Sequence, residues 1–92
     1  MPAGIVTVEG EFVREHRDEL IGTIRNEAER ERLAHPMNRL MGVADTPEGL
    51  RVTTTDIHSP QRIGEALRSA YHGDLSVRYG EDEYTVQVTW RR

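Results

Sequence analysis

Side chains able to do catalytic chemistry are few in this chain, and their spacing matches no catalytic motif. Asp56 and His58 lie close enough in sequence to share a metal ion, but hydrogen bonding within a loop is the commoner use of such a pair. The other histidines are scattered: His16, His35 and His72. A phosphate-binding Gly-x-x-x-x-Gly-Lys loop, a nucleophile elbow, a dinucleotide fingerprint and a His-Glu-x-x-His sequence are all missing. We therefore predict that the protein is not an enzyme and needs no metal or cofactor.

The segment from Thr53 to Arg62 has the residue types of an anion site. It falls between a predicted strand and a predicted helix, where free amides and the positive end of the helix dipole attract anions. The candidate ligands for a phosphate or an RNA backbone are Thr54, Thr55, His58, Ser59 and Arg62. The alternative is structural, with Ser59 capping the helix, Asp56 closing the turn and Arg62 pairing with a nearby glutamate.

A second candidate RNA surface lies near the end of the chain. Tyr79, Tyr84 and Trp90 are able to stack bases, and three arginines accompany them: Arg78, Arg91 and Arg92. Aromatic residues at period two more often face a core, so a buried strip is the competing interpretation. An ordinary RNA-recognition sheet is not expected, because Ile5–Val8 and Leu50–Thr54 contain no aromatic residue on which bases could stack.

The charge balance argues against a protein that coats nucleic acid. Sixteen acidic residues outnumber twelve basic ones, and the formal net charge is −4. Every basic residue is arginine, which suits forked phosphate recognition, although genomic base composition explains the absence of lysine more simply. The acids of residues 51–92 are concentrated in Glu81-Asp82-Glu83, which leaves room for a local basic face in this half.

Length and composition predict a single domain spanning residues 1–92. Ninety-two residues suit one modest core, and the absence of cysteine excludes disulfides and thiolate zinc sites within the chain. No apolar run approaches the ~20 residues needed to cross a bilayer, and the first residues lack the pattern of a signal peptide. We therefore expect a cytoplasmic protein with no membrane partner.

The first half of the chain is predicted to form a strand and a long helix. The β-branched run Ile5–Val8 suits a strand. Good helix formers extend from Val13 to Ala34 with one apolar stripe, and Pro36 should end this helix. The alternating charges of residues 27–32 are able to bind a partner helix but are more typical of a solvated face.

The second half is predicted to form two hairpins separated by a helix. Segments 38–44 and 50–55 flank a Pro-Glu-Gly turn and form the first hairpin. A helix begins at the cap Ser59, has a proline at its first position and ends at Gly73. Alternating apolar residues in 75–79 and 84–90 form the second hairpin.

This order predicts an α+β fold of ferredoxin-like split βαβ type, β-α-β-β-α-β-β, in which the last strand is extra. Two helices should cover one face of a mixed, mostly antiparallel sheet. Right-handed crossovers place the first strand between the third and fourth, and the last strand, 84–90, at the sheet edge. An edge strand can add to a partner's sheet, so 84–90 is a candidate site for a protein partner or a homodimer.

The runs 49–58, 62–67, 70–73 and 78–80 resemble a bacterial family of small uncharacterised proteins. In that family an N-terminal zinc ribbon with paired Cys-x-x-Cys motifs precedes a domain like this one, and Pro2-Ala3-Gly4 resembles the join. The likeness covers nearly the whole chain and implies the C-terminal domain of a longer zinc-ribbon protein. More distantly, the strand-Asp-Ile-helix-hairpin pattern is similar to the central region of the nonsense-mediated-decay-three type adaptor of the large ribosomal subunit.

The resemblance implies an RNA-associated or ribosome-associated docking role without catalytic residues. This chain contains no ribbon cysteine, so any zinc-dependent contact of the family is not available to it. Two functional hypotheses follow. One is an RNA or ribosome docking module that uses residues 54–62 and the arginines of the last hairpin, and the other is a protein-interaction module that pairs through 84–90.

Overall fold

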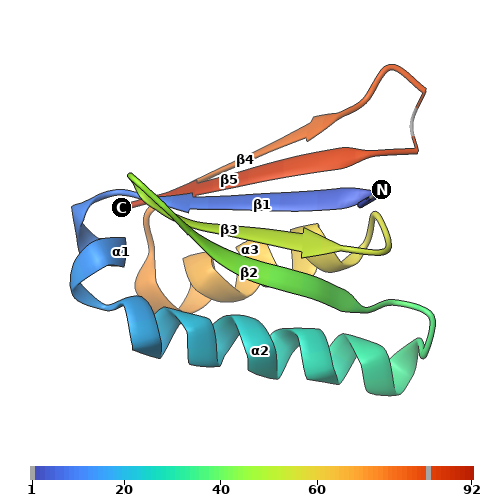
Figure 1. Cartoon of the computed structure of the whole chain (residues 1–92), viewed down its shortest axis with the longest axis horizontal. Helices are drawn as coiled ribbons and strands as arrows, with labels where there is room; N and C mark the ends of the chain where they lie inside the picture. Colours follow the sequence, from blue (N-terminus) through green and yellow to red (C-terminus); the bar gives the residue numbers. More distant parts are fainter. Residues whose placement is uncertain (1, 83) are drawn as a thin grey trace.

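A computed structural model describes residues 2–82 and 84–92 of the chain (Figure 1). The strands and helices of these residues follow one another in the order β1 (Gly4–Glu9), α1 (Glu11–Glu15), α2 (Arg17–Ala34), β2 (Leu40–Thr46), β3 (Gly49–Thr54), α3 (Ser59–Tyr71), β4 (Asp74–Tyr79) and β5 (Val86–Arg91). The predicted α+β class is confirmed. The first predicted helix is divided in two at His16, and α2 ends at Ala34, just before Pro36 as expected.

The five strands form one mixed sheet in the order β2-β3-β1-β5-β4. The central strand β1 is antiparallel to β3 and parallel to β5, and the two hairpins place β2 and β4 at the edges. The predicted position of the last strand is therefore wrong, because β5 lies between β1 and β4. In a ferredoxin-like sheet the strand after the second helix lies beside the first strand, and here β5 occupies that position instead of β4.

The apolar content of the two last strands explains this order. Alternate residues of β5 are almost completely buried, and they are Val86, Val88 and Trp90. The corresponding residues of β4 are less buried, since Leu75 is half-buried and Val77 is 41% exposed. The strand that buries more apolar surface gains more from lying over the helices, so β5 takes the inner position and β4 the edge.

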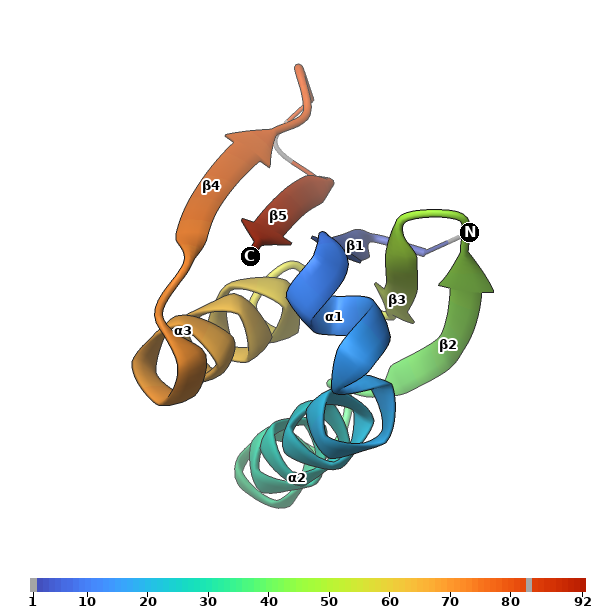
Figure 2. The same ribbon diagram turned by 90° about the vertical axis from the view of Figure 1, so that its left-hand side faces the viewer.

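The core lies between the sheet and the helices. Figures 1 and 2 show α2 and α3 on the same side of the sheet, with α1 across one end of it. The sheet contributes the fully or almost fully buried residues Val6, Val8, Leu50, Val52, Val86, Val88 and Trp90, and the helices contribute Val13, Leu20, Ile24, Ile63 and Leu67. These strand residues alternate with polar ones, which leaves a largely polar face on the side of the sheet away from α2 and α3.

Gly64 allows α3 to approach the sheet closely. A Cβ atom at this position would lie 2.7 Å from Leu75 Cδ1 and 2.8 Å from Val88 Cγ1, closer than carbon atoms tolerate. The helix therefore packs with its backbone near β4 and β5. This contact fixes α3 beneath the last hairpin.

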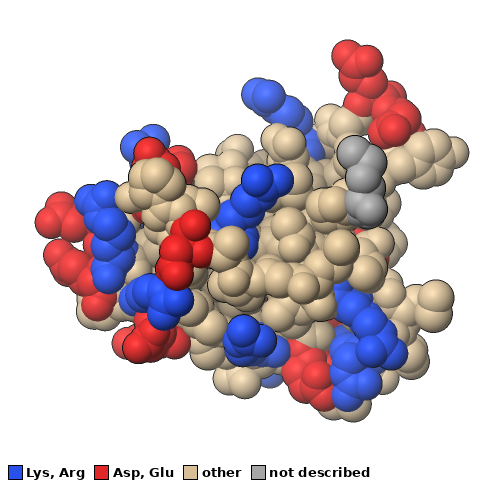
Figure 3. Space-filling model, in the orientation of Figure 1, with Lys and Arg blue, Asp and Glu red and all other residues tan. Residues whose placement is uncertain are grey.

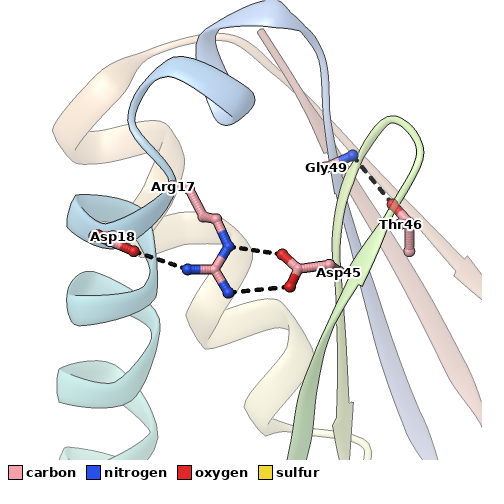
Figure 4. Close-up of polar contacts among 5 residues, drawn as sticks. All are labelled: Arg17, Asp18, Asp45, Thr46 and Gly49. Atoms are coloured by element: carbon pink, nitrogen blue, oxygen red, sulfur yellow. Dashed lines mark hydrogen bonds and ion pairs between the residues drawn. The ribbon is translucent and has the colours of Figure 1, made fainter.

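An ion pair joins the start of α2 to the edge strand β2 (Figure 4). Arg17 Nε donates a 2.7 Å hydrogen bond to Asp45 Oδ1, and Arg17 Nη2 donates a 3.1 Å bond to Asp45 Oδ2. Arg17 Nη1 also donates to Asp18 Oδ1 at 2.8 Å. The forked guanidinium lowers the pKa of Asp45, through the hydrogen bond first and the charge second, and the carboxylate raises the pKa of Arg17 in turn.

We predict that Asp45→Asn destabilises the protein at neutral pH but not in acid. The folded-state pKa of Asp45 is lowered, so its charge stabilises the fold above the pKa of the unfolded chain, and this contribution is lost as the pH falls through the folded-state pKa. Thermal unfolding of both proteins between neutral and acidic pH measures the difference. The matched control is Glu48→Gln, an exposed acid without an ion pair among the described residues, and identical profiles for wild type and Asp45→Asn would contradict the prediction.

Candidate functional site

The two predicted threonine ligands of the anion site are already used by the fold. Thr54 is fully buried, and its hydroxyl donates a 2.8 Å hydrogen bond to the carbonyl of Asp56. The Thr55 hydroxyl donates to the carbonyl of Met37 at 3.1 Å and accepts from the amide of Arg39 at 2.9 Å. Both side chains therefore tie the end of β3 to neighbouring backbone, and their hydroxyls are engaged within the protein.

The Asp56 carboxylate accepts hydrogen bonds from the backbone amides at the start of α3. Its Oδ2 accepts hydrogen bonds from the amides of His58 at 2.9 Å and Ser59 at 2.7 Å. The prediction that Ser59 caps the helix is wrong, because Ser59 is already its first residue, buried and without a side-chain capping bond. The protein's own carboxylate thus fills the position where an external anion would bind.

The two remaining candidates of this segment lie at the surface. His58 is exposed, and the Arg62 side chain is 64% exposed. Arg62 Nε lies 3.9 Å from Oε2 of the buried Glu31, whose Oε1 accepts a 3.1 Å hydrogen bond from Asn38. Most polar groups of the segment 54–62 are therefore engaged with other groups of the fold.

Of the three arginines predicted on the last hairpin, two contact other groups of the protein and one does not, within the described residues. Arg91 Nη1 lies 3.9 Å from Glu9 Oε1. Arg92 Nη1 donates to the carbonyl of Tyr71 at 2.7 Å, and its guanidinium lies 4.1 Å from the centre of the Phe12 ring. Arg78 is exposed and forms no ion pair or side-chain hydrogen bond within residues 2–82 and 84–92. Figure 3 shows arginine and acidic side chains close together over much of one face, without a continuous basic area.

The predicted aromatic strip does not form as a single surface. Trp90 is completely buried, and its Nε1 donates a 2.6 Å hydrogen bond to the carbonyl of His72. Tyr79 and Tyr84 are instead 54% and 77% exposed. Gln61 Nε2 donates to the Tyr79 hydroxyl, so this ring lies on the same side of the sheet as α3. Base stacking across all three aromatic residues is therefore excluded.

The part of the chain that the structure describes contains no group of three or more histidine or acidic side chains arranged to hold a metal ion. None of its helices is both long and apolar enough to span a membrane. The surface features that remain as candidates are the helix-free face of the sheet and its two edges.

The two edge strands differ in their regularity. β2 has a bulge between Leu40 and Gly42, and its Asp45 is held by Arg17. Bulges and charged side chains are common devices that prevent an edge from pairing with another strand. β4 pairs with β5 without any register shift from Asp74 to Tyr79. The structure thus presents β4 as the regular edge.

The exposed edge of β4 offers both backbone and apolar groups. The amide of Gly80 donates to the carbonyl of Thr85, at the end of the β4–β5 ladder. Because bonded positions alternate along an antiparallel strand, the amides and carbonyls of Leu75, Val77 and Tyr79 point away from β5. On the side facing α3, Val77 and Tyr79 are 41% and 54% exposed. Sequence reasoning assigned the edge to 84–90, although the more apolar alternation of 86–90 already favoured an inner strand for it.

We predict that Asp56→Ala lowers the free energy of unfolding by about 1 kcal/mol through loss of the helix cap. The neighbouring His58→Ala is the control and should change it little, because the described structure gives that imidazole no hydrogen bond. Thermal unfolding in low millimolar phosphate and in chloride of equal ionic strength, at concentrations where general exclusion of salt from the protein surface is negligible, tests the anion site separately. We expect equal midpoints for the wild type, and a midpoint raised only by phosphate would show that an external anion binds despite Asp56.

Comparison with known proteins adds no family to these observations: no protein-family model, no curated protein and no solved structure matches this chain. The resemblance to the zinc-ribbon family, and the RNA-associated role that it implies, stay predictions.

Proposed function

We propose that the protein is a non-catalytic protein-interaction module that binds an extended strand of a partner at the β4 edge. The observation that carries the proposal is the regular edge from Asp74 to Tyr79, which has no bulge. Strand addition at such an edge gives affinity through backbone hydrogen bonds and specificity through alternate side chains. The sequence-predicted pairing strand 84–90 is not available for strand addition, because β5 has a neighbour on both sides, and β4 is the edge strand.

β4 offers both backbone hydrogen-bonding groups and exposed side chains to an added strand. Each backbone hydrogen bond to an added strand contributes a net of about 1 kcal/mol. The exposed parts of Val77 and Tyr79 add an apolar contribution on the side of the sheet that α3 covers. The position of β4 beside α3 supports the proposal further, because Gly64 and the packed helix hold this edge in place.

We predict that β4 binds a capped Thr-Val hexapeptide that is N-methylated along one edge, so that it cannot pair with itself. Nuclear magnetic resonance should show chemical-shift changes and slower hydrogen exchange at the amides of Leu75, Val77 and Tyr79. Val77→Pro should weaken binding about tenfold, because it removes an outward amide while leaving the bonds to β5 intact.

The control for this experiment is Val77→Ala, which shortens the side chain but keeps the amide. Its affinity should fall less than that of Val77→Pro. Shifts confined to β2 or to the helix-free face, or equal affinity of the proline variant and the wild type, would contradict strand addition at β4.

The helix-free face of the sheet supports RNA binding as a second candidate function. The strand register places hydroxyl and amide side chains beside two arginines on this face, and these side chains belong to Thr7, Thr53, Thr89, Ser76 and Gln87. Arg51 and Arg78 are exposed and form no ion pair within the described chain. Contacts from these groups to phosphates would not require the central aromatic residues that the sheet lacks.

We predict that Arg51→Glu combined with Arg78→Glu weakens binding of a fluorescein-labelled single-stranded RNA 20-mer about tenfold at low salt. The slope of log affinity against log salt concentration should become shallower by about 1.4, which is about 0.7 for each arginine that contacts a single-stranded phosphate. Fluorescence anisotropy gives both values, and Arg25→Glu with Arg30→Glu on α2 is the control of equal charge change. If both double variants bind RNA alike, the sheet face is not the binding surface.

A further inference from the structure

We propose that two copies of this chain pair through their β4 strands, antiparallel, with Ser76 of each copy facing Ser76 of the other across a two-fold axis. The inference rests on the proposed function, since it uses the same edge and names a second copy as the partner. Four properties of β4 support it: the direction of its free backbone groups, its charges, its apolar side chains and the contrast with β2.

The backbone allows this register. The free amides and carbonyls of β4 belong to Leu75, Val77 and Tyr79, as the Gly80 to Thr85 bond shows. When Ser76 faces Ser76, Leu75 of one copy lies opposite Val77 of the second, and both residues point their backbone groups toward each other. A register shifted by one residue would set an outward residue opposite an inward one, and the hydrogen bonds could not form.

The charges select this register among those that the backbone allows. With Ser76 on the axis, Asp74 of each copy lies opposite Arg78 of the other, on the face without helices. Moving the axis to Arg78 would face arginine with arginine, and moving it to Asp74 would face two acids. An axis at Leu75 or Val77 leaves both charges opposite neutral residues. Neither Asp74 nor Arg78 forms an ion pair within the described residues, so both are free to pair with a second copy.

The apolar side chains are self-complementary in the same register. Leu75 and Val77 of one copy lie opposite Val77 and Leu75 of the other, on the side that α3 covers. Pairing therefore covers apolar surface of Val77, which is 41% exposed in the single chain. The two-fold pairing uses the β4 edge of both copies, so the interface is self-complementary and the assembly closes as a dimer. The other edge strand, β2, has a bulge between Leu40 and Gly42, which makes it less suited to further pairing.

Disulfide trapping tests the register directly, because the chain contains no cysteine of its own. In the proposed dimer the two Ser76 residues form a non-hydrogen-bonded pair with Cα atoms about 4.5 Å apart, within the range of a disulfide. Ser76→Cys should therefore form covalent dimers under mild oxidation. The control is Arg78→Cys on the same strand and face, whose two copies would lie about 13 Å apart along the strands and beyond that range.

We expect Ser76→Cys to cross-link at least about tenfold faster than Arg78→Cys at the same protein concentration, as measured on non-reducing gels. Equal rates would indicate random collision and would overturn the inference. Faster cross-linking of Arg78→Cys would also overturn it, since that outcome requires the axis at Arg78.

A charge exchange tests the same pairing without a covalent bond. Asp74→Arg and Arg78→Asp should each weaken the homodimer about tenfold, because each places like charges opposite one another at two symmetric positions. An equal mixture of the two variants should regain the wild-type affinity as a heterodimer, in which every arginine faces an acid. Sedimentation equilibrium gives the affinities, and a mixture no tighter than either single variant would contradict the proposal.

Thermal unfolding of each variant at high dilution separates effects on folding from effects on dimerisation. The mixture remains informative even if both single variants lose some stability.

The outcome also separates this inference from the proposed function. A wild-type chain that stays monomeric and does not cross-link through Ser76→Cys, yet binds the Thr-Val peptide at β4, would refute self-pairing and leave strand addition standing. Loss of both would refute the two together.

Discussion

Burial of one apolar strand face against α3 is the constraint from which the useful surface of this protein follows. Val86, Val88 and Trp90 are covered by the helices, and their burial draws β5 into the sheet beside β1. The strand that precedes β5 in the chain is then left at the edge. A regular edge beside a packed helix is thus a by-product of core formation, and it is also the feature most suited to binding another strand.

Several charged side chains of this protein are paired with other groups of the same chain. Asp56 satisfies the helix amides that would otherwise attract an anion, and Arg17 is held by Asp45 in a forked pair. Arg92 is held by a carbonyl and an aromatic ring. Most of the charged groups that looked available in sequence therefore have partners in the fold. Three arginines have no ion pair or side-chain hydrogen bond within the described residues: Arg51 and Arg78 lie on the face of the sheet that carries no helix, and Arg25 lies on α2.

The helices and strands were predictable because their signals are local. The period-two and helical spacings indicated every strand and the helix α3, and Pro36 indicated the end of α2. The break at His16 was missed because α1 is held by contacts with distant residues, such as the amide of Phe12 donating to the carbonyl of Arg92. The sequence did not predict the capping role of Asp56: it indicated Ser59 as the cap and Asp56 as a residue that closes the turn, since a serine before a proline carries the same local signal as a true cap.

By itself the amino-acid sequence determined the α+β class, the order of the strands and of the two long helices along the chain, and the absence of any known catalytic motif, because these depend on residue type and short-range spacing. The tertiary structure alone decided which strand is the edge, which aromatic residues are buried and which polar groups remain free. These depend on which of two neighbouring hairpin strands buries more apolar surface against α3. That comparison involves residues more than twenty positions apart, such as Ile63 and Val88, and it is settled only when the whole core is assembled.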